Sequence, residues 1–148
     1  MVAAAVRLID KLGYRVGNEA YLEENATRGI STLAKKNVMV DENSNEVEIE
    51  FVGKGGRLVQ ARFSDGLVAD VLSECHEISG QRLFRFQSEP GKRTEIDSGD
   101  INRYLAEVFE ADITAKGLRT WRATVAATEF LRRIKRPRDR ETEVRDAI

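Results

Sequence analysis

The feature that most constrains the fold is a change in the spacing of apolar residues near Asn37. Before it, apolar residues recur every three or four positions over 2–12, which predicts an amphipathic helix. After it, Val47, Ile49 and Phe51 alternate with polar residues, which is typical of a strand with one buried face. The chain must therefore combine helices with a sheet in its first half.

Three antiparallel strands are expected within residues 37–63, because two turn sequences interrupt the alternation. The first turn, 41–45, is polar, and the second is Gly53-Lys54-Gly55-Gly56. Lys54 stands at the tip of the second hairpin, where glycines let the backbone turn tightly and approach a ligand. A hairpin lysine usually only improves solubility, but it can also deliver an ammonium group to a site formed elsewhere.

Helices are expected on both sides of this β-meander. The predicted ranges are 2–12, 18–28, 64–79, 98–110 and 114–136, and residues 83–86 form a short apolar segment before a polar turn. Asn18, Ser98 with Asp100, and Thr114 are residue types that cap helix starts. We predict an α+β fold, mainly α-helical, with a small three-stranded antiparallel meander, as a single domain over residues 1–148.

Composition narrows the class of protein only a little. The formal net charge is −1, but residues 119–140 carry eight basic and two acidic groups. This run is either a footprint for a polyanion or simply a soluble face. The single cysteine, Cys75, can form no internal disulfide, and no apolar run is long enough to span a bilayer. We therefore expect a cytoplasmic protein with no membrane partner.

The stretch 114–124 carries the clearest chemical signal. Lys116, Arg119 and Arg122 surround the only tryptophan, Trp121, near the start of a predicted helix. The amino end of a helix is positively polarised, so cations there repel it unless an anion lies between them. Arginine suits phosphate because its planar group donates two parallel hydrogen bonds. The alternative is a solvated basic face with Trp121 in the core.

Two further cations extend this hypothesis to a reaction. If Arg15, Lys54 and Arg119 converge on one phosphodiester, the arginines neutralise charge on its non-bridging oxygens, and the lysine protonates a departing 5′ oxygen. Such a site needs no metal, and this set contains no nucleophile. The alternative role for Arg15 is a salt bridge to Glu19 or Glu23.

Four stretches of the sequence resemble the type IB DNA topoisomerases of the bacterial and poxvirus kind. They are Arg15 to Tyr21 with Gly29 to Leu33 after it, Phe51 to Gly56, Gly80 to Phe84, and Thr114 to Thr124, in the family's order. The resemblance implies the catalytic-core fold that topoisomerases IB share with tyrosine recombinases. It assigns catalytic roles to Arg15, Lys54 and Arg119. Recombinases usually have histidine where this chain has Lys116.

The family's reaction is implied in the same way. A tyrosine attacks the scissile phosphate, forms a 3′-phosphotyrosyl link and lets the cut strand swivel before resealing, without ATP, metal or other cofactor. The catalytic histidine and tyrosine follow the Arg119 helix in the family, and His76, Tyr14, Tyr21 and Tyr104 do not match their motifs. We also expect no counterpart of the family's amino-terminal clamp domain within these residues.

We therefore predict a partial catalytic core that binds duplex DNA weakly, does not cleave it and is a monomer, nucleoid-associated if bacterial. Candidate contacts to the DNA backbone, besides the catalytic set, are Lys35, Lys36, Lys92, Arg93, Lys116 and Arg122. Three alternatives remain open: a non-catalytic DNA-binding module, a tyrosine recombinase fragment, and a globular domain unrelated to nucleic acid.

Overall fold

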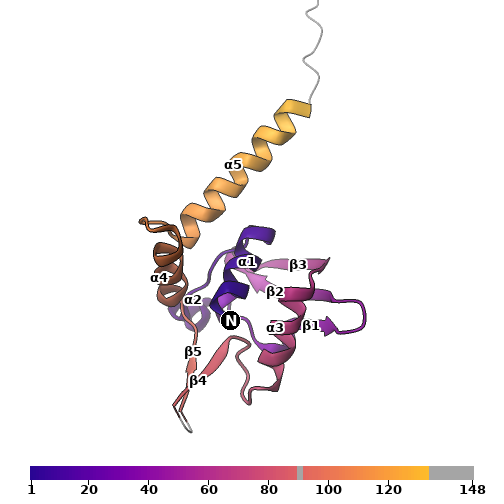
Figure 1. Cartoon of the computed structure of the whole chain (residues 1–148), viewed down its shortest axis with the longest axis vertical. Helices are drawn as coiled ribbons and strands as arrows, with labels where there is room; N and C mark the ends of the chain where they lie inside the picture. Colours follow the sequence, from indigo (N-terminus) through magenta and orange to yellow (C-terminus); the bar gives the residue numbers. More distant parts are fainter. Residues whose placement is uncertain (90–91, 134–148) are drawn as a thin grey trace, which may run out of the picture.

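The computed structural model describes residues 1–89 and 92–133. Figure 1 shows a body of helices around a small sheet, from which the last helix projects as a long arm. The helices are α1 (Val2–Leu12), α2 (Glu19–Asn25), α3 (Gly66–Glu77), α4 (Ser98–Phe109) and α5 (Ala115–Arg133). The strands are β1 (Val38–Asp41), β2 (Glu46–Gly53), β3 (Arg57–Ser64), β4 (Arg85–Glu89) and β5 (Lys92–Glu95).

The first three strands form an antiparallel sheet in the order β1-β2-β3. Val40 pairs with Val47 at the first turn, and Gly53 pairs with Arg57 at the second. The alternation seen in the sequence holds in space, because Val47, Ile49 and Phe51 are buried while Glu50 and Val52 are exposed. The predicted α+β fold with an antiparallel meander is therefore confirmed.

Helix α1 lies at the centre of the molecule and contacts α3, α4 and α5. Its residues Leu8 and Ile9 are fully buried in one core with Leu72 of α3 and Leu105 of α4. Because the core holds α1 in place from several sides, the connection that follows it starts from a fixed point. That connection carries Arg15.

An ion-pair cluster joins the start of α3 to α1. Asp65 caps α3 by accepting a hydrogen bond from the Val68 amide, and its Oδ2 accepts from Arg7 at 2.9 Å and Lys11 at 3.0 Å. Burial raises the pKa of the Asp65 carboxyl, but these hydrogen bonds outweigh it and leave the pKa below its ordinary value. Asp65 therefore stabilises the packing of the two helices while it is ionised.

Several element boundaries differ from the sequence-based expectation. Helix α2 ends at Asn25 rather than near residue 28, because Ala26 adopts a left-handed conformation at φ 53° and turns the chain back toward the sheet. Helix α4 is capped by Asp97, whose side chain accepts from the Asp100 amide at 2.8 Å. The described residues on the two sides of the predicted polar turn pair as antiparallel strands β4 and β5, which the apolar spacing did not indicate.

Helix α5 starts where it was predicted and then leaves the body. Thr114 accepts from the Gly117 amide at 3.2 Å, and Asn102 of α4 accepts from the Ala115 amide at 2.9 Å. Trp121 is 66% exposed, so the alternative that placed it in the core is wrong. The predicted last turn, 134–136, and the basic groups after it lie outside the described residues. In the described part of the chain, no helix combines the length and apolar character needed to cross a membrane.

Candidate functional site

Arg15 lies in the short connection between α1 and α2, as predicted. Two backbone hydrogen bonds hold this connection against the segment after α2: the Ile30 amide donates to the Arg15 carbonyl at 2.9 Å, and the Ser31 amide donates to the Val16 carbonyl at 2.7 Å. The backbones of Gly17 and Gly29 cross where the two segments meet. The backbone of Arg15 is therefore fixed even though it belongs to no helix or strand.

Lys54 reaches the same region from the β2–β3 hairpin. The Arg28 amide donates to the Val52 carbonyl at 2.8 Å, which ties the hairpin to the segment that also holds Arg15. The Lys54 ammonium lies 5.1 Å from the centre of the Tyr21 ring. A cation at this distance from an aromatic face is attracted by the ring's electron density. The hairpin tip thus has two contacts that direct its ammonium toward Arg15.

Arg119 comes from the early turns of α5 and is the most constrained of the three cations. Its Nε donates to the Gly13 carbonyl at 2.8 Å, so the helix is anchored to the connection that carries Arg15. Burial, and then the positive charge of Arg15, lower the pKa of the Arg119 guanidinium. Two arginines are therefore held close enough to repel one another.

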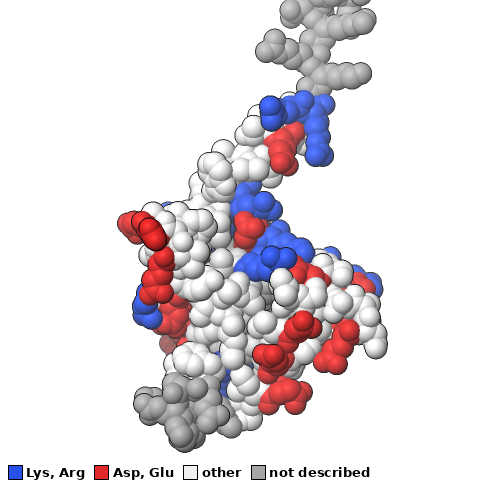
Figure 2. Space-filling view, viewed as in Figure 1, with Lys and Arg blue, Asp and Glu red and all other residues white. Residues whose placement is uncertain are grey.

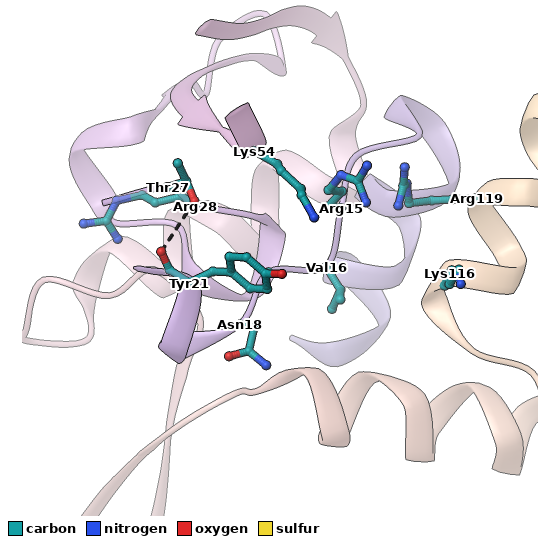
Figure 3. Close-up of a pocket in the computed structure, with 10 residues that line it drawn as sticks. Arg15, Val16, Asn18, Tyr21, Thr27, Arg28, Lys54, Lys116 and Arg119 are labelled. Carbon is teal, nitrogen blue, oxygen red and sulfur yellow. Dashed lines mark hydrogen bonds between the residues drawn. The ribbon is translucent and has the colours of Figure 1, made fainter. Parts of the chain in front are cut away.

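These residues line one open pocket of about 210 Å³. Figure 3 shows the charged ends of Arg15, Lys54 and Arg119 gathered at it, with Lys116 set apart from them nearer the start of α5. The other residues that line it are Val16, Gly17, Asn18, Tyr21, Thr27 and Arg28. None of the ten is acidic. The structure therefore brings together the three predicted catalytic residues and Lys116.

The cations of the pocket lack counterions within the part of the chain that the structure describes. There, neither Arg15, Lys54, Lys116 nor Arg119 forms an ion pair. Glu19, the partner considered for Arg15, pairs with Arg82 instead. Several unpaired cations in one hollow repel each other, and an anion with several oxygens removes that repulsion by bonding to all of them. The pocket is therefore suited to a phosphate group.

The remaining charged candidates do not join this pocket. Lys35 donates to the carbonyls of His76 and Ile78 at the end of α3, which makes it part of the fold. Arg122 pairs with Asp10 at 3.2 Å and donates to the Asp10 carbonyl at 2.9 Å, so it docks α5 on α1. These contacts give both side chains a role in the fold, and their contact with the DNA backbone stays a prediction.

Two other expectations have different outcomes. Lys36 is exposed, but it lines a depression on the sheet together with Glu48 and Glu50, away from the cationic pocket. Lys92 and Arg93 belong to β5, and their side chains lie outside the described part of the structure. Their role as backbone contacts stays a prediction.

The tyrosines and the histidine occupy distinct places. Tyr14 donates to the Gln60 carbonyl at 3.0 Å and packs edge-on against Phe51. Tyr104 lines a groove between α1, α4 and α5, and His76 is partly buried in α3. Burial, and next the charge of Lys35, lower the pKa of His76. Only Tyr21 lines the cationic pocket, and Figure 3 shows its ring directed into it.

Sequence reasoning missed three polar residues of the pocket wall, Asn18, Thr27 and Arg28. Asn18 was recognised only as a helix cap, and Arg28 was assigned to a helix that ends before it. Figure 3 shows the Arg28 guanidinium turned away from the three cations, and it donates to the Thr32 carbonyl at 2.6 Å. The only signal for Arg28 was its position beside Gly29, whose close contact with Gly17 becomes visible only in the fold.

Figure 2 shows basic side chains gathered where the base of α5 meets the body, while most acidic groups lie along the left edge and at the lower right of the body. The uneven distribution explains how a chain of net charge −1 presents a cationic site. A surface of this kind attracts a polyanion from a distance and orients it before contact. In the described residues there is no cluster of side chains that could hold a metal ion.

Comparison with known proteins agrees with this geometry. The chain matches over residues 1–148 the family model described as "Eukaryotic DNA topoisomerase I, catalytic core". It is 27% identical to DNA topoisomerase 1B of Acanthamoeba polyphaga mimivirus, over 96% of this chain and 44% of that protein. It is 32% identical to DNA topoisomerase 1 of Daucus carota, over 88% of this chain and 16% of the relative.

A third relative is the mitochondrial DNA topoisomerase I of Rattus norvegicus, 28% identical over 93% of this chain and 23% of the relative. The chain thus spans less than half the length of these relatives. The family model matches the whole chain, and the relatives from a virus, a plant and an animal are all named as DNA topoisomerases of type 1. The chain belongs to the family of the DNA topoisomerase I catalytic core.

Proposed function

We propose that this chain forms the phosphate-binding part of a type IB DNA topoisomerase, which cuts one strand of duplex DNA through a 3′-phosphotyrosyl link and relaxes supercoils. The observation that carries the proposal is the convergence of Arg15, Lys54 and Arg119 on one pocket without acidic lining residues. Family membership supports it independently.

Each of the three cations has a distinct task in this reaction. Attack by a tyrosine oxygen on phosphorus adds negative charge to the non-bridging oxygens, which Arg15 and Arg119 neutralise by hydrogen bonding. The attacking tyrosine releases its phenolic proton to solvent, the bond between phosphorus and the 5′ oxygen breaks, and Lys54 gives that oxygen a proton, which the neutral lysine then regains from solvent. Resealing reverses these steps, so no net proton, ATP or metal ion is consumed.

Pre-organisation of the arginines supports this assignment. The Arg119 side chain is anchored to the Gly13 carbonyl, and two hydrogen bonds hold the backbone at Arg15 and Val16, so both residues are placed at the pocket before a phosphate arrives. Lys54 sits instead on a hairpin tip with positive φ angles at Gly55 and Gly56. A lysine on an exposed tip can follow the oxygen whose bond is breaking.

DNA binding is tested by fluorescence anisotropy of a labelled duplex at increasing salt. Each phosphate contact contributes about −0.9 to the slope of log K against log salt. Lys54→Gln and Arg119→Gln should each reduce the slope by about that amount. Arg62→Gln is the matched control, because Arg62 is an exposed arginine already paired with Glu46 and Glu48. Equal slopes for all three variants and the unmodified chain would contradict the proposal.

Cleavage needs a separate assay, because a DNA-binding module that does not cut would give the same slopes. The 148-residue chain is incubated with a nicked duplex that traps 3′-linked protein, and covalent adducts are separated on a denaturing gel. We expect no adduct, since Tyr14 is engaged with the Gln60 carbonyl, Tyr104 lies in another groove, and Tyr21, which lines the pocket, does not match the motif of the family's nucleophile. An adduct that disappears in Tyr21→Phe would instead identify Tyr21 as the nucleophile and revise our assignment.

A further inference from the structure

A second hollow, of about 480 Å³, shares a wall with the cationic pocket. Arg15, Lys54 and Arg119 line both hollows, as does Arg28, so the three catalytic candidates lie on the boundary between the hollows, which we call the ridge. The second hollow has Arg57 as an additional cation and no acidic residue among the eleven that line it. The cationic surface therefore continues past the position assigned to the scissile phosphate.

Arg57 is placed by the same hairpin that carries Lys54. It is the first residue of β3 and pairs with Gly53, the last residue of β2, so the two cations flank the turn. Its side chain is exposed, and it forms no ion pair with any residue in the described ranges. Arg62 on the same strand differs, because it pairs with Glu46 and Glu48.

The floor of the second hollow also favours a backbone ligand. Gly53 and Gly55 line it without side chains, and a Cβ built on Gly55 would meet nothing within 4 Å. Open glycine backbone lets a bulky polymer approach closely. The Tyr14 hydroxyl, which also lines this hollow, is occupied by the Gln60 carbonyl, so the free donors near the ligand are the cations.

We propose that Arg57 binds a second backbone phosphate of the DNA, next to the one held by Arg15, Lys54 and Arg119. The inference rests on the proposed function, because it takes that phosphate as its reference point. Phosphates follow one another at short intervals along a strand, so a strand that crosses the ridge places one phosphate in each hollow. This contact fixes the register of the strand and holds the hairpin, and therefore Lys54, against the DNA.

The first test compares Arg57→Gln with Arg62→Gln in the anisotropy assay. Arg57→Gln should make the slope of log K against log salt less steep by about 0.9. When the salt concentration rises fourfold, the factor by which the affinity falls should therefore be about 3.5 times smaller for this variant than for the unmodified chain. Arg62→Gln removes the same charge from the same strand and should leave the slope unchanged. Both residues are exposed, and thermal unfolding checks that both variants fold.

The second test locates the phosphate. A set of duplexes carries one neutral methylphosphonate at successive positions in either strand, and each duplex is measured with the unmodified chain and with Arg57→Gln. At one position, the neutral linkage and Arg57→Gln should each lower the affinity by the same factor. Combining the two changes should lower the affinity no further. We expect this position to lie in the cut strand. It should be next to the phosphate at which a neutral linkage and Lys54→Gln cause the same, non-additive loss of affinity. A position in the complementary strand overturns the single-strand path.

The outcomes separate this inference from the proposed function. If Lys54→Gln reduces the slope and Arg57→Gln does not, the second phosphate contact is refuted and the proposed function stands. If neither variant changes the slope, both proposals fail. If Arg57→Gln and Arg62→Gln reduce the slope equally, the effect comes from net charge and the contact at Arg57 is refuted.

Discussion

Replacing Gly29 with alanine should displace the connection that carries Arg15. A Cβ at this position would lie 2.3 Å from the Gly17 nitrogen, 2.5 Å from the Gly17 Cα and 2.6 Å from the Arg15 carbonyl oxygen. All three atoms belong to the backbone and cannot rotate away. The φ of Gly29 is −136°, which suits any residue, so only lack of space demands glycine here.

The expected loss of stability follows from the contacts that break when the two segments move apart. Moving the two segments apart by about 1 Å breaks the hydrogen bonds from Ile30 and Ser31, at about 1 kcal/mol each, and adds roughly 1–3 kcal/mol of overpacking. Alanine also restricts the unfolded chain more than glycine does, which offsets about 0.4–1 kcal/mol of this loss. We expect a net loss of about 2–4 kcal/mol in the free energy of unfolding, or roughly 5–15 °C in melting temperature.

Urea unfolding measures the stability loss, and the anisotropy assay measures the effect on Arg15. Since Arg15 is displaced, Gly29→Ala should also reduce the salt slope by up to about 0.9 under conditions where the variant is folded. Gly66→Ala is the control, because its Cβ would meet only Asn45 side-chain atoms, the nearest at 3.7 Å. We expect no loss of stability or binding for that variant.

Two outcomes would refute this reasoning. If Gly29→Ala is as stable as Gly66→Ala, the close crossing of Gly17 and Gly29 does not exist in solution. If Gly29→Ala is destabilised but keeps the full salt slope, Arg15 is positioned independently of this crossing, and its assignment to the phosphate site must be reconsidered.

Three further predictions concern the elements that frame the site. Asp65→Asn should cost about 1–2 kcal/mol at pH 7, since it removes a carboxylate bound by two cations of α1. Because the pKa of Asp65 is depressed in the folded state, its contribution is present above its unfolded pKa of about 3.9 and is lost as pH falls through the folded pKa. The urea midpoints of Asp65→Asn and the unmodified chain, measured from pH 7 to pH 2, should therefore converge at low pH. A constant difference between the two midpoints over this range would contradict the lowered pKa of Asp65. Gly117→Ala should stabilise α5 by about 0.5–1 kcal/mol, because its Cβ would lie 3.6 Å from the Thr114 hydroxyl, an ordinary contact; a lower melting temperature would show that the first turn needs glycine. A double-mutant cycle of Arg122→Gln and Asp10→Asn should give a coupling of about 0.2–1 kcal/mol in urea unfolding, since both side chains are about half exposed, and zero coupling would mean that this pair does not dock α5.

The sequence by itself determined the elements and the residue types of the site. The alternation around Ile49, the helical spacing in α1 and the cap at Thr114 are local properties, because they depend on neighbours within a few positions. The position of Arg15 between two helices and of Lys54 at a hairpin tip followed from the same local signals. The β4–β5 hairpin did not, because its strands pair across a turn that apolar spacing alone does not mark.

Only the tertiary structure decided which of the cations act together. Arg119 reaches the Gly13 carbonyl across 106 positions of sequence, whereas Arg122, one turn later, is neutralised by Asp10. The ammonium of Lys35 is likewise used to bind the end of α3. Whether an arginine or a lysine is free depends on which carboxylates and carbonyls the fold brings beside it, and those partners are distant in sequence. The residue types in the chain thus predict a phosphate site, and long-range packing decides which of these side chains remain unpaired at the pocket.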